Sequence, residues 1–245
     1  MKNRYLGRRQ FLLLSFTASL STTLTLSAQA QTTSRLGNKP NSLKFLSVPP
    51  VKGGIPAGVI VCLHGSGSKP QTLLSLAHSL NLPDYHFLFP EAPYPDPSVP
   101  GGKMWYDLKS GNHKGLAQSH QLLTDWLKSL ENLTGIPLAS TILSGFSQGG
   151  AMTLDVGLTL PLAGLVSLSG YLPSKLQAET KGSMPPILMV QGRQDRIVTL
   201  NEAQEARNAL TALGVAVKYV ELDIGHELKP QVLEQMRNFV VDVFK

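Results

Sequence analysis

The sequence is most informative at residues 141–151, which read Thr141-Ile142-Leu143-Ser144-Gly145-Phe146-Ser147-Gln148-Gly149-Gly150-Ala151. A short apolar run leads into Gly-x-Ser-x-Gly and then into a helical pattern, which is the strand, turn and helix order of a nucleophile elbow. Gly145 and Gly149 allow close approach of the neighbouring backbone while Ser147 occupies a strained turn. We therefore predict that Ser147 is a nucleophile rather than a residue of an ordinary turn.

Outward from this stretch, short apolar runs alternate with helical patterns. The runs are Ser42–Val48, Gly58–Leu63, His86–Phe89, Thr141–Leu143, Leu165–Leu168, Ile187–Val190 and Ala216–Leu222. Several are continuous, as expected for strands buried on both faces. Helices are predicted over Thr72–Leu80, Leu116–Leu130, Gln148–Leu160, Asn201–Leu213 and Pro230–Phe244, with Asn201 as a cap. This alternation predicts an α/β fold with a mostly parallel central sheet and helices on both faces.

One segment breaks the alternation. Residues 90–115 are rich in proline and glycine and have little periodic apolar pattern. A long irregular segment inside a compact domain is usually a functional lid or a disordered insert. Trp105 and Tyr106 within it favour ordered packing.

A serine nucleophile needs a base and an orienting acid. His226 directly follows the last predicted strand, and open parallel sheets place their sites at the carboxyl ends of strands. Asp195 follows the apolar strand at 187–190 and lies between Ser147 and His226 in chain order, as an acid of this kind does. It would hold the imidazole tautomer and stabilise the imidazolium. Asp223 and Asp155 are the rival acids.

An oxyanion hole needs two donors. One is expected to be the backbone N–H of Gln148, the residue after the nucleophile, at the positive end of the following helix. The other is expected after an early strand, where Val61–Gly67 ends in His-Gly-Ser-Gly, and Ser66 is the residue chosen. Both donors are backbone groups, so a side-chain substitution would not remove them.

Composition restricts the class of protein. The chain has 245 residues, 42% of them apolar and 16% charged, which excludes a disordered tail protein and allows one sizeable core. Its one cysteine, Cys62, excludes an intramolecular disulfide and a multi-cysteine zinc site. Four positive charges of the net +6 lie in the first 30 residues, so the remainder carries +2. We therefore expect no nucleic-acid partner. A serine nucleophile with a histidine base implies no metal and no organic cofactor.

The N-terminus has the pattern of an export signal. Residues 1–10 are basic, residues 11–26 are uncharged, and Ala28-Gln29-Ala30 offers small residues before a cleavage site. Arg8-Arg9 followed by Phe-Leu is typical of twin-arginine (Tat) signals. The alternative is a membrane anchor, but the apolar stretch is shorter than the roughly 20 residues that a span requires. We expect cleavage after Ala30.

This reading divides the chain into three parts. Residues 1–30 are expected to be the signal peptide, residues 31–41 a linker, and residues 42–245 the catalytic α/β domain. The Tat translocon would be a partner during export to the periplasm or the medium, and no stable membrane span would remain after cleavage. The oligomeric state is left open.

The chain resembles the phospholipase/carboxylesterase family of α/β-hydrolases, which includes acyl-protein thioesterases and small bacterial carboxylesterases. The resemblance covers about residues 58–240 and rests on motifs in the family's order, which are Leu63-His64-Gly65-Ser66-Gly67, Pro90-Glu91-Ala92-Pro93, Met104-Trp105-Tyr106-Asp107, Gly145-Phe146-Ser147-Gln148-Gly149-Gly150, Gln191-Gly192-Arg193-Gln194-Asp195 and Gly225-His226. It implies the same roles for Ser147, Asp195 and His226, and oxyanion donors at Ser66 and Gln148. It also implies that Trp105 and Asp107 support the loop beside the pocket, with Trp105 as a substrate contact.

Two positions depart from the family pattern. Ser68 stands where the first loop often has aspartate, and Ser66 stands where a bulky apolar residue is common. The function expected is an exported serine hydrolase that cleaves carboxylic esters, like a carboxylesterase or lysophospholipase, through an acyl-enzyme on Ser147. The alternatives are an acyl thioesterase, a peptidase or polyester-oligomer esterase, and a non-catalytic binding protein on the same scaffold.

Overall fold

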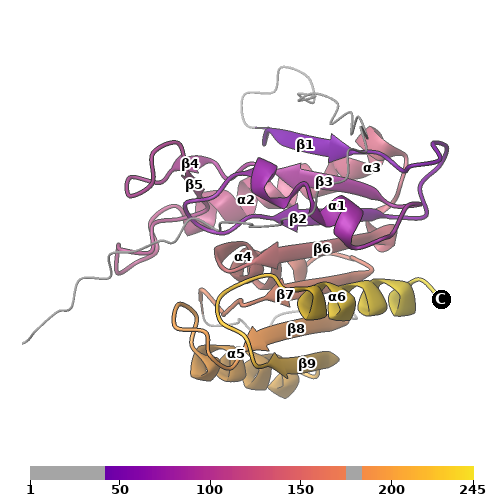
Figure 1. Cartoon of the computed structure of the whole chain (residues 1–245). Helices are drawn as coiled ribbons and strands as arrows, with labels where there is room; N and C mark the ends of the chain where they lie inside the picture. The colour runs from indigo at the N-terminus through magenta and orange to yellow at the C-terminus, as the bar shows by residue number, and fades with distance from the viewer. Residues whose placement is uncertain (1–41, 175–183) are drawn as a thin grey trace, which may run out of the picture.

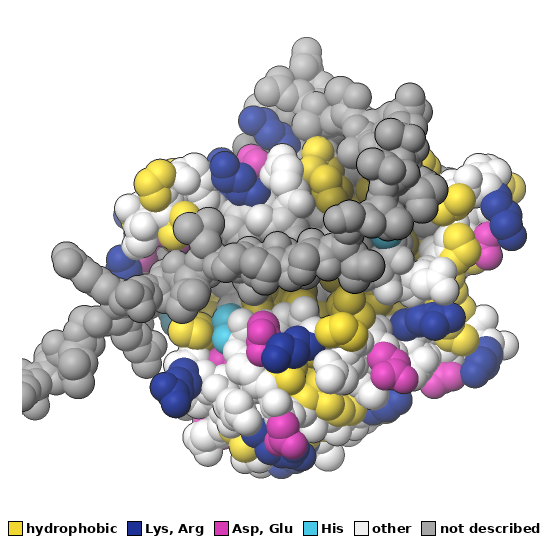
Figure 2. All heavy atoms as spheres, viewed as in Figure 1, with side chains coloured by type: hydrophobic (Ala, Val, Ile, Leu, Met, Phe, Trp, Pro, Cys, Tyr) yellow, Lys and Arg dark blue, Asp and Glu magenta, His cyan; other side chains and the backbone are white. Residues whose placement is uncertain are grey.

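The computed structural model describes residues 42–174 and 184–245. The predicted signal peptide over residues 1–30, its cleavage after Ala30 and the linker over 31–41 lie outside these residues. Among the described helices, none is both long and apolar enough to cross a bilayer. Figure 2 shows Lys and Arg side chains interspersed with Asp and Glu over the described part of one face.

A seven-stranded sheet forms the centre of the domain (Figure 1). Its spatial order is β1-β3-β2-β6-β7-β8-β9, and every neighbouring pair is parallel except β1 with β3. The strands are β1 Phe45–Val48, β2 Val59–Leu63, β3 His86–Pro90, β6 Thr141–Phe146, β7 Gly164–Leu168, β8 Ile187–Gly192 and β9 Val217–Leu222. A separate antiparallel pair joins β4 (Tyr94–Pro95) to β5 (Lys103–Met104). The predicted mostly parallel α/β sheet is confirmed.

Helices cover both faces of this sheet. They are α1 Leu76–Ser79, α2 Leu116–Lys128, α3 Leu130–Thr134, α4 Gln148–Gly157, α5 Leu200–Ala212 and α6 Pro230–Val243, with 3₁₀ turns at Pro70–Leu73 and Leu138–Ser140. Side chains of α2, α4 and α5 pack on one face in a core that includes Val61 and Leu143. Side chains of α1 and α6 pack on the other face around Ile60 and Ile142, and both helices lie on the near side in Figure 1. Alternate residues of one strand therefore enter two different cores.

Three helix predictions need correction. The helix expected over Thr72–Leu80 is a 3₁₀ turn followed by the short α1, and the one over Leu116–Leu130 divides into α2 and α3 at Ser129. Asn201 does not cap α5. The cap is Thr199, whose extended backbone lets its hydroxyl accept the Glu202 N–H while the Glu202 carboxylate accepts the Thr199 N–H.

The irregular segment is ordered by burial. Trp105 and Tyr106 have no exposed surface, as the sequence predicted for ordered packing. Gly67 N–H donates to the Lys103 carbonyl at 2.8 Å and Lys103 N–H donates to the Ser68 carbonyl at 2.9 Å. The segment therefore lies against the loop that follows β2, at the carboxyl end of the parallel strands.

Candidate active site

Ser147 occupies a sharp turn between β6 and α4. Its φ of 56° and ψ of −118° lie in a backbone region that residues other than glycine rarely adopt. A Cβ at Gly145 would lie 2.2 Å from the Gly149 carbonyl oxygen, and one at Gly149 would lie 2.3 Å from the Leu63 carbonyl oxygen. Glycine is therefore required at both positions for β6, α4 and β2 to approach closely enough to form the elbow.

Asp195 and His226 form a hydrogen-bonded pair. The distance from His226 Nδ1 to Asp195 Oδ2 is 2.7 Å, and the carboxylate has no exposed surface. Asp195 Oδ1 accepts the backbone N–H groups of Ile197 at 2.8 Å and Val198 at 3.0 Å. The carboxylate thus orients the imidazole while its other oxygen is held by the chain that follows it.

Two opposing effects act on the Asp195 carboxyl. Burial is the largest and raises its pKa, but the hydrogen bond and charge of His226, with the two backbone N–H groups, outweigh it. The pKa of Asp195 therefore lies below its ordinary value, and the group is an anion at neutral pH. An anionic acceptor assigns the proton of the imidazole to Nδ1 and leaves the Nε2 lone pair free to accept a proton.

His226 also packs beside the elbow. Its ring lies 4.7 Å from the ring of Phe146, measured between centroids, and Phe146 directly precedes Ser147. Within the described part of the chain, the Ser147 hydroxyl makes no hydrogen bond. Contacts between a serine nucleophile and its base are often long until substrate binds. The structure thus brings Ser147, His226 and Asp195 to one edge of the sheet.

Two backbone donors flank Ser147. A Cβ at Gly65 would lie 3.3 Å from the Ser147 Cβ, so the loop after β2 passes beside Ser147. Neither the Ser66 N–H nor the Gln148 N–H donates to another of the described residues. These are the two groups expected from the sequence, and their roles as oxyanion donors stay a prediction. The Ser66 hydroxyl itself donates to Asp96 Oδ2 at 3.0 Å.

His64 has a structural role that the sequence did not predict. It is fully buried, and its Nε2 accepts the Ala92 N–H at 3.1 Å, so Nδ1 carries the proton and donates to the Gly65 carbonyl at 2.8 Å. Burial lowers the pKa of His64 to about 4 and outweighs the opposing hydrogen bond to Gly65. A neutral imidazole therefore ties the loop beside Ser147 to the chain after β3. The position of His64 at the end of a predicted strand, directly before Gly65, was the one feature of the sequence that could have indicated this role.

Trp105 does not line the site, which corrects the expectation of a substrate contact. The ring has no exposed surface, and its Nε1 donates to the His64 carbonyl at 2.9 Å. A side chain without exposed surface cannot touch a substrate. Asp107 does support its loop, since its carboxylate accepts the Lys109 N–H at 2.8 Å.

The rival acids are engaged elsewhere. Asp155 accepts a hydrogen bond from His120 Nδ1 at 2.8 Å, and the pKa of His120 is raised chiefly by that bond. Asp223 is 76% exposed and accepts from Arg193 at 2.8 Å. Of the three carboxylates considered, Asp195 is the one that contacts His226.

Side chains that could hold a metal ion do not gather at one place in the described part of the chain. No cluster of three or more His, Cys, Asp or Glu side chains occurs within residues 42–174 and 184–245. Cys62 is buried, and burial raises the pKa of its thiol to about 12, outweighing the opposing hydrogen bond from Ser144. The thiol is therefore protonated and unreactive at neutral pH.

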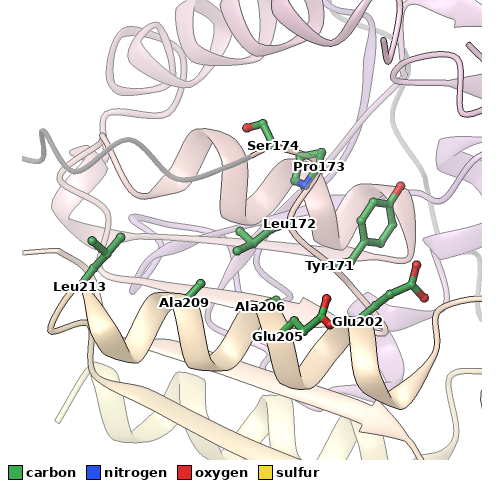
Figure 3. A pocket seen from close by; sticks show the side chains of 9 residues that line it. All are labelled: Tyr171, Leu172, Pro173, Ser174, Glu202, Glu205, Ala206, Ala209 and Leu213. Atoms are coloured by element: carbon green, nitrogen blue, oxygen red, sulfur yellow. The ribbon is translucent and has the colours of Figure 1, made fainter. Parts of the chain in front are cut away.

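Two hollows lie near the carboxyl ends of the strands. One of about 570 Å³ adjoins the Asp195 loop and is lined by Arg193, Gln194, Asp195, Arg196, Gly225 and Glu227. Figure 3 shows the other, of about 590 Å³, between residues 171–174 and α5. Its floor is apolar, and the side chains of Glu202 and Glu205 extend along one side. Neither Ser147 nor His226 lines either hollow.

Comparison with known proteins agrees with this architecture. The phospholipase/carboxylesterase family model matches residues 52–243. Acyl-protein thioesterase 1 homolog 1 of Dictyostelium discoideum is 28% identical over 202 residues, which are 75% of this chain and 89% of the relative. Acyl-protein thioesterase 1 of Neurospora crassa is 28% identical over 214 residues, covering 75% of this chain and 85% of the relative.

Solved structures lead to the same assignment. Esterase PE8 superposes with a TM-score of 0.77 at 29% identity, covering 82% of this chain and 99% of that one. The carboxylesterase of Bacillus cereus, at 18% identity, has a TM-score of 0.70 over 82% of this chain and 94% of its own, and shows the fold alone. Since the family match covers most of the chain, the protein belongs to the phospholipase/carboxylesterase family and is an α/β-hydrolase of the esterase and thioesterase type.

Proposed function

We propose that this hydrolase cleaves carboxylic esters through a covalent acyl-enzyme on Ser147. The observation that carries the proposal is the 2.7 Å hydrogen bond between His226 and the buried Asp195, beside the strained turn that bears Ser147. A buried carboxylate that accepts a hydrogen bond from one imidazole nitrogen leaves the other nitrogen basic. A base beside a serine hydroxyl activates that hydroxyl as a nucleophile.

In the first half of the reaction, Ser147 Oγ attacks the acyl carbonyl carbon while His226 Nε2 takes its proton. The carbonyl oxygen becomes an oxyanion and accepts hydrogen bonds from the N–H groups of Ser66 and Gln148. When the tetrahedral intermediate collapses, the bond to the alcohol oxygen breaks and the imidazolium returns its proton to that oxygen. The products are an alcohol and an ester on Ser147.

In the second half, water takes the place of the alcohol. His226 accepts a proton from water, which attacks the acyl carbon through the same oxyanion arrangement. Collapse breaks the bond to Ser147 Oγ, and the proton held by His226 returns to it. Asp195 stays ionised in both halves and stabilises each imidazolium. No step needs a metal or an organic cofactor.

The substrates proposed are short- to medium-chain esters or lysophospholipids. A second candidate is an acyl thioester, which the names of the thioesterase relatives favour. The same serine attack accepts a sulfur leaving group, and a thiolate leaves with less help from the imidazolium than an alkoxide does. Ester and thioester therefore differ in how strongly their turnover depends on proton donation by His226.

A matched panel distinguishes the two candidates. Alkyl esters and thioesters with identical acyl chains of graded length would be assayed with wild-type protein and with Ser147→Ala. We expect a higher kcat/KM for the ester of each pair, and a loss of roughly 10⁴-fold or more in Ser147→Ala. Consistently higher kcat/KM for thioesters would reassign the substrate class.

The remaining alternative is a non-catalytic binding protein. A folded wild-type chain without turnover that also takes no fluorophosphonate label would establish that alternative.

We also propose that the chain is exported through the Tat pathway, on the evidence of Arg8-Arg9 and Ala28-Gln29-Ala30. Sequencing the N-terminus of protein from the source cell should find Gln31 first. An intact Met1 or a start elsewhere would refute cleavage after Ala30.

A further inference from the structure

The side chain of Gln148 makes two hydrogen bonds that catalysis by its backbone N–H does not require. Its Oε1 accepts the Trp105 N–H at 2.8 Å, and its Nε2 donates to the Tyr106 carbonyl at 2.7 Å. The residue is 1% exposed, so water does not compete for either bond. The first residue of α4 is thereby joined to the backbone of two adjacent residues of the irregular segment, Trp105 and Tyr106.

The same segment is joined to the loop after β2. Trp105 Nε1 donates to the His64 carbonyl, two residues before Ser66. Lys103 exchanges backbone hydrogen bonds with Gly67 and Ser68, directly after Ser66. Residues 103–106 therefore hold the Ser66 loop on both sides and are themselves held by the Gln148 side chain.

We propose that the side-chain amide of Gln148 is a positioning residue that sets the spacing between the two oxyanion donors. It holds residues 103–106 against α4, and those residues hold the loop that carries the Ser66 N–H. The inference rests on the proposed function, because that function assigns the N–H groups of Ser66 and Gln148 to an oxyanion. The side chain at 148 then affects catalysis even though the donor at 148 is a backbone group.

The chemistry of the amide explains why this residue type is needed. The two partners are a backbone N–H and a backbone carbonyl, so one side chain must both accept and donate at its tip. Methionine has a similar length but offers only a weak acceptor and no donor, and an ionised glutamate offers the acceptor alone. Without the amide, the two buried peptide groups would be unpaired, and the segment would shift to find partners.

The test compares Gln148→Met with Thr153→Val, a matched control on the same helix. Thr153 is fully buried, and its hydroxyl donates to the Gly149 carbonyl at 3.0 Å, within α4 rather than to another element. A misplacement of about 1 Å costs about 10²-fold in rate. We expect kcat to fall about 10- to 100-fold in Gln148→Met with KM within about twofold of wild type, and Thr153→Val to keep its kcat within about twofold.

Two further readouts separate positioning from general destabilisation. The rate of fluorophosphonate labelling of Ser147 should fall by the same factor as kcat, since phosphonylation uses the same donors. Amide hydrogen exchange in the peptide spanning residues 103–107 should be faster in Gln148→Met and unchanged in Thr153→Val. If Gln148→Met does not fold, Gln148→Glu replaces it, and a fall in kcat and labelling rate at least as large is expected, because its carboxylate keeps the acceptor but meets the Tyr106 carbonyl without a donor.

The outcomes are distinct. An active wild type whose folded Gln148 variant matches Thr153→Val in kcat, labelling rate and hydrogen exchange overturns the positioning role and leaves the proposed function intact. A wild type with neither ester turnover nor labelling overturns the proposed function, and the positioning role with it. A fall in kcat and labelling with unchanged exchange at residues 103–107 also overturns the role, because the loss would not pass through that segment.

Discussion

Replacing Asp195 by asparagine should nearly abolish turnover without unfolding the protein. The introduced amide has the same shape, and its oxygen can still accept the N–H groups of Ile197 and Val198 that Oδ1 accepts now. Toward His226, however, it presents an NH₂ donor in place of the carboxylate oxygen that lies 2.7 Å from Nδ1. Nδ1 would then have to accept, so the ring proton would move to Nε2, the nitrogen that must act as the base.

The size of the effect follows from that tautomer. In serine hydrolases with this arrangement, the same change lowers kcat by about 10⁴-fold, which is about 5 kcal/mol at 1.36 kcal/mol per decade. The loss should lie in kcat, because Asp195 has no exposed side-chain surface and does not touch substrate. Steady-state assays with one chromogenic ester would give kcat and KM, and thermal unfolding of the same samples would report the fold.

Asp223→Asn is the matched control, since Asp223 is exposed, lies three residues before His226 and pairs with Arg193. It should keep its kcat within about twofold, because an exposed ion pair contributes little. A kcat within tenfold of wild type in Asp195→Asn would show that Asp195 does not set the tautomer of His226. The acid role would then pass to another carboxylate.

Three further predictions concern stability. Because burial lowers the pKa of His64 from 6.5 to about 4, the unfolded chain binds its proton more tightly between these values, so the free energy of unfolding should rise by about 3 kcal/mol from pH 4 to 7. Urea titrations at several pH values would measure how the free energy of unfolding depends on pH. His64→Asn should lose this part of the pH dependence, and an unchanged pH dependence would contradict the neutral, buried state of His64. Gly145→Ala should cost about 3 kcal/mol or more because its Cβ meets the Gly149 carbonyl, whereas Gly111→Ala, with open space around it, should change stability by less than about 1 kcal/mol. Thr199→Ala should cost about 1 kcal/mol and Asn201→Ala less than about 0.5 kcal/mol by thermal unfolding, and the reverse order would return the cap to Asn201.

Much of the fold could be predicted because the signals are local. Continuous apolar runs such as Ile187–Val190 indicate strands buried on both faces, and the sheet contains a strand at each such run. The elbow was equally visible, since Gly145 and Gly149 are needed within a few residues of Ser147. Asp195 and His226 each follow a strand of a parallel sheet, so their meeting at one edge followed from topology. Their catalytic roles stay predictions.

The features that the sequence did not predict depend mostly on contacts between segments that are distant in the chain. Whether Trp105 lines a pocket or fills the interior depends on the His64 carbonyl, which lies 41 residues earlier in the chain. The two bonds of the Gln148 side chain link residues more than 40 positions apart and leave no periodic trace in the sequence. The cap at Thr199 was misassigned by two residues because Thr and Asn both favour that position, and backbone geometry decides between them.

Covalent labelling would show whether Ser147 is the residue that forms the acyl-enzyme. Wild-type protein would be treated with a fluorophosphonate, digested and mapped by mass spectrometry beside Ser147→Ala. We predict one adduct per chain, on the peptide that contains Ser147, with loss of ester turnover in proportion to labelling and no adduct in Ser147→Ala. Turnover that survives complete labelling of Ser147, or an adduct on another serine that accounts for the lost activity, would contradict it.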